Sequence, residues 1–458
     1  MAERTIVTLG DTLAALVEGK KYTTLRDILV TMNAVDVAAV FEDMPQDKLP
    51  LLFRLLPKEL AAETFVEMAP EAQELLIQGF SDNELKEVVD ELYVDDAVDI
   101  VEEMPANVVK RILQQADPEM RKMINEILKY PDDSAGSIMT TEYVSLRPNM
   151  TAEEAIKRIR RVGVDKETIY TCYVTDNNRK LIGMISLRTL MLADDDDVVQ
   201  DIMETNVISA NTLEDQESVA QMFTKYDFSA LPVVDQENRL VGIITVDDAI
   251  DVLQEETTED FEKMAAMLPS EDTYLKTSVL RLAWHRFPWL LILMISAMFT
   301  GGIITHFEDV LASAQGIGVA IVSCIPMLMD TGGNCGAQAS TLVIRGLALG
   351  EVSPRDVGRI LWKELRVAVL LGVVLSIVNF LRIWWFTAYS RDVAFVVSLA
   401  MFCTIVIAKA IGSTLPLAAK AVHLDPALMA SPIITTIVDA ASLLILFTIA
   451  TSMFHIGA

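Results

Sequence analysis

The chain has 458 residues, of which 52% are hydrophobic, and a formal net charge of −28 at pH 7. Residues 1–283 carry 27 Lys and Arg against 56 Asp and Glu, whereas residues 284–458 carry 10 against 9. An acidic region of this kind disfavours nucleic acid and anionic lipid surfaces and favours cations. The cysteines and histidines show no metal-ligand spacing, and no P-loop or nucleophile–base motif is present, so neither a zinc site nor a soluble enzyme is expected.

Residues 1–131 contain short amphipathic segments separated by prolines, as in EDMP, RLLP, EMAP and EEMP. Because proline interrupts helices, this region predicts an all-α domain of stacked helix hairpins wound into a superhelix. The N-terminus lacks the apolar core of a signal peptide, so we expect this domain in the cytoplasm.

A tandem repeat follows over residues 137–257. SIMTTEYVSL matches DIMETNVISA, and Asp176 and Gly183 of the first copy recur as Asp235 and Gly242 in the second. Each copy predicts a strand, a helix, two strands joined by a turn, and a helix. The pattern resembles a pair of CBS domains, here 137–199 and 200–257, which form one module and often bind adenine nucleotides.

An acidic helix leaves the second copy, with the sequence TVDDAIDVLQEETTEDFEKM. Asp248 and Asp251 lie three residues apart, which places both on one helix face. Glu256, Glu259 and Asp260 share a face for the same reason. Stacked carboxylates repel one another unless a cation lies among them, although a solvated acidic helix has the same spacing. Matching acids elsewhere are Glu63, Asp95, Asp99, Asp215, Glu217 and Asp227.

The apolar region 284–458 has five stretches long enough to cross a bilayer, at about 287–306, 315–345, 358–387, 392–420 and 427–454. A long connecting helix over residues 258–283 is expected to join them to the acidic helix. The distribution of Lys and Arg places the N-terminus in the cytoplasm and the C-terminus outside the cell membrane. An odd number of spans suggests that a second copy completes any pore, most simply as a two-fold homodimer.

The second and fourth spans carry polar residues that are costly in a bilayer. In the second, Asp330, Asn334 and Gln338 interrupt the apolar run together with several glycines. This pattern indicates either a seam of close helix packing or a broken helix beside a path. In the fourth, Lys409 either pairs with an acid or extends to the interface.

The fifth span contains one ionisable residue, Asp439, within ALMASPIITTIVDAASLLILFTIATSMF. A carboxylate near mid-membrane costs about 2.5–3.5 kcal/mol on insertion scales. Such a residue either is satisfied by a neighbouring helix or lies on an aqueous path, where it meets a cation. Backbone carbonyls near Pro432 or in segment 332–336 could complete a ring of oxygens around an ion.

Over essentially its whole length the chain resembles the MgtE family of magnesium channels. The most specific motifs are MDTGGNCGAQASTLVIRGLALGE, HLDPALMASPIITTIVDA and TVDDAIDVLQEETTEDFEKM. The resemblance implies a homodimer that passes Mg²⁺, with the pore ion at Asp439 and a further acid, Asp425, at the cytoplasmic end of the pore. It also maps the family's Mg²⁺-sensing acids onto Glu63, Asp95, Asp99, Asp215, Glu217, Asp248, Glu256, Glu259 and Asp260.

One departure from the family pattern concerns nucleotide binding. In the family, an Arg-Asp pair of the first repeat and an aromatic residue of the second lie around the adenosine. Arg188 and Phe228 fit this pattern, but Thr189 replaces the Asp. The replacement weakens the prediction that this CBS pair binds ATP.

We therefore expect a multidomain membrane protein with an all-α superhelical domain, α/β tandem CBS domains, a connecting helix and five transmembrane helices. Its expected function is Mg²⁺ uptake through a channel that cytosolic Mg²⁺ inhibits by binding the acids of the soluble domains and the connecting helix. One alternative is a carrier that couples the divalent cation to protons or sodium through Asp439. The other is a CBS membrane sensor without a pore.

Overall fold

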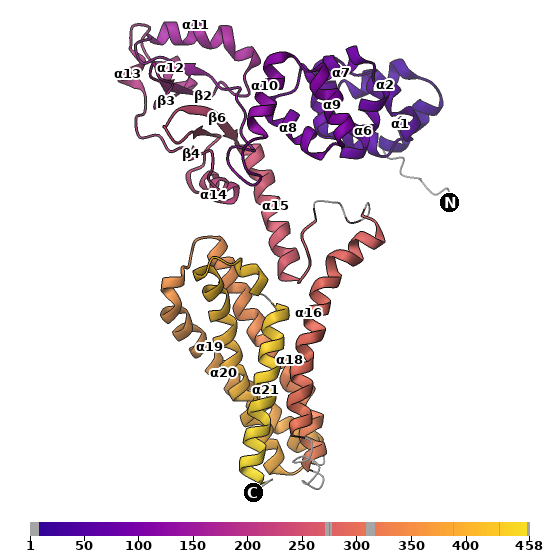
Figure 1. The fold of residues 1–458 in the computed structure, drawn as a ribbon, viewed down its shortest axis with the longest axis vertical. Helices are drawn as coiled ribbons and strands as arrows, with labels where there is room; N and C mark the ends of the chain where they lie inside the picture. The colour runs from indigo at the N-terminus through magenta and orange to yellow at the C-terminus, as the bar shows by residue number, and fades with distance from the viewer. Residues whose placement is uncertain are drawn as a thin grey trace, which may run out of the picture. The chain divides into compact units, whose positions relative to one another are not determined.

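The computed structural model describes residues 9–270, 274, 277–307, 317–387, 389–429 and 431–455. The chain divides into two compact units, Met1–Leu253 and Gln254–Ala458 (Figure 1). Helix α15 (Val246–Met264) begins in the first unit and ends in the second.

The described part of the first unit begins with helices joined by short turns, in agreement with the predicted all-α domain. Proline opens α6 and α10, where the missing N–H group is harmless, and Asp117 caps α10 by accepting from the backbone N–H groups of Glu119 and Met120. The helices are α1 (Leu9–Glu18), α2 (Tyr22–Leu29), α3 (Ala34–Glu42), α4 (Leu49–Phe53), α5 (Lys58–Val66), α6 (Pro70–Gly79), α7 (Asp82–Val89), α8 (Val94–Glu103), α9 (Ala106–Gln115) and α10 (Pro118–Ile127).

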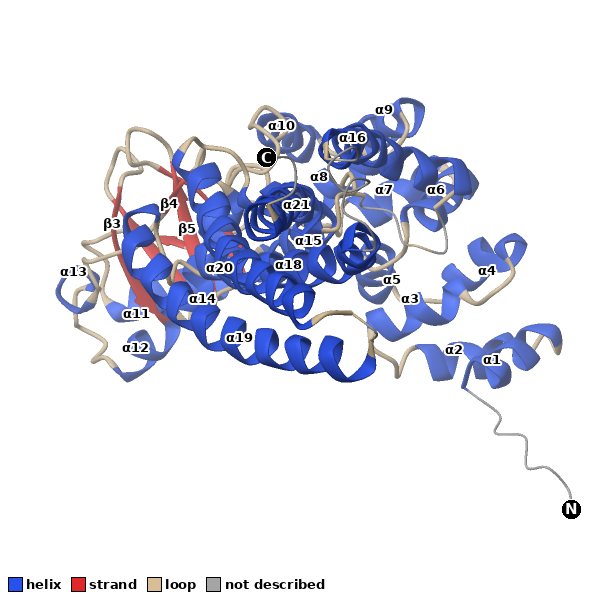
Figure 2. Ribbon diagram, turned by 90° about the horizontal axis from the view of Figure 1, so that it is seen from below, coloured by secondary structure: helices blue, strands red, loops and turns tan. Residues whose placement is uncertain are grey.

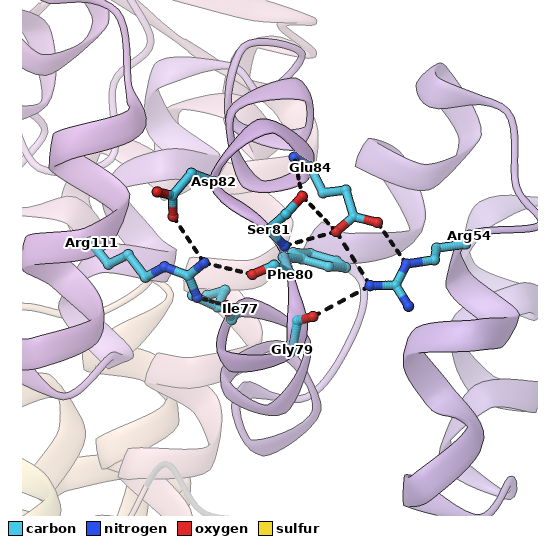
Figure 3. Close-up of polar contacts among 8 residues, drawn as sticks. All are labelled: Arg54, Ile77, Gly79, Phe80, Ser81, Asp82, Glu84 and Arg111. Carbon is cyan, nitrogen blue, oxygen red and sulfur yellow. Dashed lines mark hydrogen bonds and ion pairs between the residues drawn. The ribbon is translucent and has the colours of Figure 1, made fainter.

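Two arginines hold the turn between α6 and α7 from opposite sides (Figure 3). Arg54, at the end of α4, donates from Nε to Oε1 of Glu84 at 2.6 Å and from Nη2 to the carbonyl oxygen of Gly79 at 3.4 Å. Arg111 of α9 donates to the carbonyl oxygen of Phe80 at 2.6 Å. The hydrogen bond from Arg54 is the main reason that the pKa of Glu84 falls to about 2. These contacts link α4, α7 and α9, so neighbouring hairpins stay stacked.

Two sheets follow, each of three strands in the order of the sequence. In both, the first strand is parallel to the second and the second is antiparallel to the third. The first repeat contains β1 (Ser145–Leu146), α11 (Ala152–Val162), β2 (Thr171–Thr175), β3 (Leu181–Ser186) and α12 (Leu187–Leu192), and α13 (Val199–Ile202) lies at the junction with the second. The second contains β4 (Ala210–Asn211), α14 (Gln216–Tyr226), β5 (Ala230–Val234) and β6 (Leu240–Thr245), before α15.

The two repeats exchange their opening segments. Met139 of the first repeat packs on Gly242 of the second, where an added Cβ would lie 2.7 Å from the methionine sulfur. Met203 of the second repeat packs on Gly183 of the first, where the corresponding distance is 2.5 Å. Both segments also form backbone bridges to β6 and β3, respectively. The division at 199/200 therefore follows the sequence repeat, whereas each folded sheet is extended by a segment of the other repeat.

The second unit contains, within its described residues, five helices long and apolar enough to cross a membrane, which confirms the predicted spans. They are α16 (Val279–His306), α18 (Ile317–Ala348), α19 (Val357–Phe386), α20 (Arg391–Ala421) and α21 (Ser431–Phe454). Helix α20 packs against α18 and α19, while α21 packs against α16, α18 and α20 (Figure 2).

The predicted connecting helix over 258–283 is wrong in its middle part. Helix α15 ends at Met264, and α16 begins only at Val279. Between them the backbone reverses at Ala266, which has a positive φ of 55°. Pro269 explains the interruption, because proline disfavours a helical conformation at the residue before it. The N–H group of Leu268 then donates to the carbonyl oxygen of His285 at 3.0 Å.

Candidate functional site

The glycines of α18 form a packing seam. The helix is continuous from Ile317 to Ala348, so of the two alternatives that the sequence left open, a packing seam or a broken helix, the structure has the seam. A Cβ on Gly332 would lie 2.6 Å from Cγ2 of Thr404 on α20 and 2.9 Å from Cγ1 of Val438 on α21. A Cβ on Gly336 would lie 2.7 Å from Cγ2 of Ile434. The absence of side chains at these positions lets α18 approach two helices at once.

The polar residues of α18 lie on a different face. Asp330, Asn334 and Gln338 follow one another at four-residue intervals and are all exposed. Nδ2 of Asn334 donates to Oδ1 of Asp330 at 3.2 Å. These three residues are called the polar stripe below. Because hydrocarbon offers no partners to carboxylate and amide groups, a stripe of this kind faces protein or water rather than lipid.

Asp439 lies half-buried on α21, close enough to Asp330 for the two carboxylates to interact electrostatically. Acids from two neighbouring membrane helices therefore share one region of the bundle. The hydroxyl groups of Thr435 and Thr436 donate to the carbonyl oxygen of Pro432 at 2.9 and 3.0 Å, so this carbonyl already has donors. Together α18 and α21 offer carboxylate and amide oxygens, which are the ligands that Mg²⁺ prefers.

Lys409 pairs with an acid, which answers the question that the sequence left open. Its Nζ lies 3.4 Å from Oε2 of Glu364 on α19, and the two side chains are only 5% and 12% exposed. The pair therefore lies inside the bundle. Breaking such a pair leaves a buried charge uncompensated, whereas the intact pair is neutral.

A second group of charged residues lies around Asp425, between α20 and α21. Oδ1 of Asp425 accepts from the backbone N–H group of Ala427 at 2.8 Å. Its Oδ2 lies 2.8 Å from Nζ of Lys263, which in turn lies 2.7 Å from Oε1 of Glu259. Burial, together with the charge of Asp425, raises the pKa of Asp260. Glu259 and Asp260, predicted to share a helix face, thus lie close to Asp425, a proximity that the sequence did not predict, and Lys263 lies among them.

A third group lies in the first unit, between α8 and the CBS pair. Asp95 has only 7% of its surface exposed, and burial, then the charge of Asp248, raise its pKa. The same two causes raise the pKa of Asp96 to about 6 and also raise that of Asp99, which stays in contact with solvent. Asp248 accepts hydrogen bonds from Thr245, yet burial raises its pKa to about 6. The predicted acids Asp95, Asp99 and Asp248 are therefore neighbours.

This third group includes acids that the sequence analysis missed. Burial, followed by the charges of Asp247 and Asp96, raises the pKa of Glu167 to about 7. Oε2 of Glu167 is buried without a hydrogen-bond partner. Glu142 also acts on Glu167, and no spacing in the sequence links either glutamate to α8. We call the full set the α8 acid group: Asp95, Asp96, Asp99, Glu142, Glu167, Asp247 and Asp248.

Glu63 is exposed on α5, and it is Glu67 at the end of that helix whose charge acts on Asp96. Among the residues that the structure describes, no three His, Cys, Asp or Glu side chains are placed to hold a metal ion together. Direct coordination would therefore require the carboxylates to move closer to one another. A hydrated Mg²⁺ ion, which keeps several waters, is held across wider gaps.

The remaining predicted acids have local roles or lie on α15. Asp215 caps α14 by accepting from the backbone N–H group of Ser218 at 3.1 Å, and Glu217 follows in the first turn. Asp227 ends the same helix in a left-handed conformation with a φ of 55°. Asp251, which is exposed, and the partly buried Glu256 lie on α15.

The residues predicted for nucleotide binding lie in both repeats. Arg188 is exposed on α12, whereas Phe228 stacks on Tyr226 with ring centroids 5.4 Å apart. Phe228 also lines a pocket of about 300 Å³ beside α14 and α15. Thr189 stands where the family pattern has Asp, and its hydroxyl lies 2.8 Å from that of Ser186, which caps α12. ATP binding stays a prediction.

Family models match this architecture in chain order. The MgtE intracellular N domain matches residues 32–133, the CBS domain matches 135–196 and 199–255, and the divalent cation transporter MgtE matches 325–449. The magnesium transporter MgtE of Thermus thermophilus is 36% identical over 454 residues, which is 98% of each chain. The chain belongs to the MgtE family of magnesium transporters. The MgtE transporter of Bacillus subtilis is 33% identical and covers 96% of each chain.

Solved structures of MgtE cytosolic parts resemble about half of the chain. The cytosolic domain of a Mg²⁺ channel MgtE in complex with ATP has a TM-score of 0.51 and 37% identity, covering 53% of this chain and 100% of that one. The soluble part of a magnesium transporter has a TM-score of 0.50 and 31% identity, covering 54% and 97%. The N-terminal domain and CBS pair therefore have the fold of MgtE cytosolic modules.

Proposed function

We propose that this MgtE protein is a Mg²⁺ channel whose ion path runs along α18 and α21. The observation that carries the proposal is the polar stripe on a membrane-length helix, next to Asp439. A path lined by carboxylate and amide oxygens attracts a divalent cation and leaves its water shell in place. Asp439 is the residue that holds the ion, and Asp330 adds a second negative charge beside it.

A second copy of the chain completes this path. The polar stripe is exposed and Asp439 only half-buried, and lipid is an unsuitable neighbour for either. A two-fold axis beside α18 and α21 would bring two stripes face to face and supply two copies of Asp439. The basic residues of the loops support a cytoplasmic N-terminal domain and CBS pair, with the C-terminus outside.

Cytosolic Mg²⁺ controls the path through the acids of the soluble domains. In the α8 acid group, raised pKa values record the free-energy cost of holding carboxylates close together. Mg²⁺ bridging these acids would remove the repulsion and hold the soluble domains together. An ion at about ten times its dissociation constant contributes about 1.4 kcal/mol, so four such ions suffice to move a two-state switch from mostly open to mostly closed.

The test is Mg²⁺ flux into liposomes that contain only the purified full-length protein. A channel gives flux that follows the Mg²⁺ gradient and voltage, and Mg²⁺ added on the side of the soluble domains reduces it. Flux that requires a proton or sodium gradient would indicate a coupled carrier instead. Absence of flux under every gradient would indicate a sensor without a pore, and either outcome would overturn the proposal.

A further inference from the structure

Lys263 lies between Glu259 and Asp425, two acids to which the family resemblance gives a role in sensing or conducting Mg²⁺. Its Nζ is 2.7 Å from Oε1 of Glu259 and 2.8 Å from Oδ2 of Asp425. The lysine side chain is 21% exposed, less than those of Glu259 and Asp425, at 37% and 30%. The lysine side chain is thus the most enclosed of the three, and its ammonium group lies between the two carboxylates.

This arrangement joins two elements of the second unit that are far apart in sequence. Glu259 and Lys263 lie one turn apart on α15, whereas Asp425 follows α20. A Mg²⁺ ion held by the same two carboxylates would link the same elements. An ammonium group and a Mg²⁺ ion cannot occupy one gap of this size together, so one excludes the other.

We propose that Lys263 is a tethered competitor of Mg²⁺. Its single positive charge offsets part of the negative charge of Glu259 and Asp425 when Mg²⁺ is scarce, and Mg²⁺ binds them only after the ammonium group has moved away. Lys263 thereby raises the Mg²⁺ concentration at which this part of the sensor becomes occupied. The inference rests on the proposed sensing function and extends it to a residue that sets the threshold.

A purely structural role makes a different prediction. Lys263 is the basic residue in the last turn of α15, where a positive charge also stabilises a helix by interacting with its dipole. A lysine that acts only in this way leaves Mg²⁺ binding unchanged when it is replaced. If Lys263 only holds α15 against the turn after α20, its replacement weakens that link. The closed state of the channel is then harder to reach, so that more Mg²⁺ is needed.

The experiment compares Lys263→Met with Lys263→Arg in the full-length protein in lipid nanodiscs and liposomes. The control is Lys122→Met, which changes the net charge equally at an exposed pair with Glu126, where the lysine side chain is 74% exposed. Two quantities are measured: the Mg²⁺ concentration that halves the flux, and Mg²⁺ binding by titration calorimetry. Size-exclusion chromatography checks folding, and Lys263→Gln replaces Lys263→Met if the latter aggregates.

Lys263→Met is expected to lower both Mg²⁺ midpoints about tenfold, the factor that a unit charge about 5 Å from a divalent ion gives in water-like surroundings. Lys263→Arg and Lys122→Met are expected to leave them within about twofold, because the local charge is kept in both. Unchanged or raised binding midpoints in Lys263→Met would overturn competition. If Mg²⁺ added on the side of the soluble domains does not reduce flux through the wild-type protein, the proposed gating is overturned instead. Competition is then judged from calorimetry alone.

Discussion

Lys409 on α20 and Glu364 on α19 form an ion pair inside the membrane unit, with Nζ and Oε2 3.4 Å apart. Replacing one partner leaves the other charge buried and alone, so Lys409→Met or Glu364→Gln is expected to destabilise the protein by about 3–5 kcal/mol. The double variant Lys409→Met/Glu364→Met removes both charges and should recover most of that loss. Thermal unfolding of the detergent-solubilised protein measures the difference, and a double variant less stable than either single one would contradict this account.

The glycine seam of α18 predicts that one added methyl group disturbs the bundle. Gly332→Ala would place Cβ 2.6 Å from Cγ2 of Thr404, which forces the helices apart at a cost of about 1–3 kcal/mol. Gly301→Ala on α16 is the matched control, because nothing lies within 4 Å of its added Cβ. Thermal stability and Mg²⁺ flux should both fall in Gly332→Ala and stay unchanged in Gly301→Ala. Equal behaviour of the two variants would show that the seam is loosely packed.

We predict that protonation of the α8 acid group partly substitutes for Mg²⁺ binding, because both relieve the repulsion between its carboxylates. The pKa values of Asp96 and Asp248 are raised to about 6 and that of Glu167 to about 7, above their values in an unfolded chain. The contribution of these protonated groups to the free energy of unfolding is therefore fully present below about pH 4 and is lost as the pH rises to about 7. Without Mg²⁺, hydrogen exchange of α8, expressed relative to the intrinsic exchange rate at each pH, should be slower at pH 5.5 than at pH 8. Added Mg²⁺ should slow it mainly at pH 8, and a protective effect of Mg²⁺ that is equal at both pH values would contradict the role of these acids.

Thr189 predicts weak binding of ATP. Its hydroxyl lies beside that of Ser186 instead of offering the carboxylate of the family pattern. Thr189→Asp restores an acceptor for two sugar hydroxyl groups and is expected to tighten ATP binding about tenfold, which corresponds to about 1.4 kcal/mol. Titration calorimetry of the full-length protein measures both affinities, with Thr168→Asp as a control outside α12. Tight binding by the wild-type chain would show that Thr189 does not limit affinity.

The sequence was sufficient for features that depend on local pattern. The five spans follow from apolar length, the two sheets from the repeat, and the helical N-terminal domain from its prolines. The interruption after α15 was also readable, because Pro269 lies within the predicted connecting helix.

Features that depend on tertiary contact could not be read in this way. Lys409 has its partner on another helix, and Glu167 joins α8 across a domain boundary. Lys263 was visible in the sequence, but its position between Glu259 and Asp425 depends on how α15 meets the turn after α20. Such pairs are set by packing, which no residue spacing records.

In the proposed channel Mg²⁺ passes Asp439, and flux through the Asp439→Asn variant tests this role most directly. Asp392→Asn, the same change at an exposed position at the start of α20, is the control. Both variants are compared with wild type in liposomes at one Mg²⁺ gradient and voltage. Flux is expected to fall at least tenfold in Asp439→Asn, because the neutral amide no longer attracts the ion, and to stay unchanged in Asp392→Asn. Wild-type flux in a folded Asp439→Asn protein would contradict it.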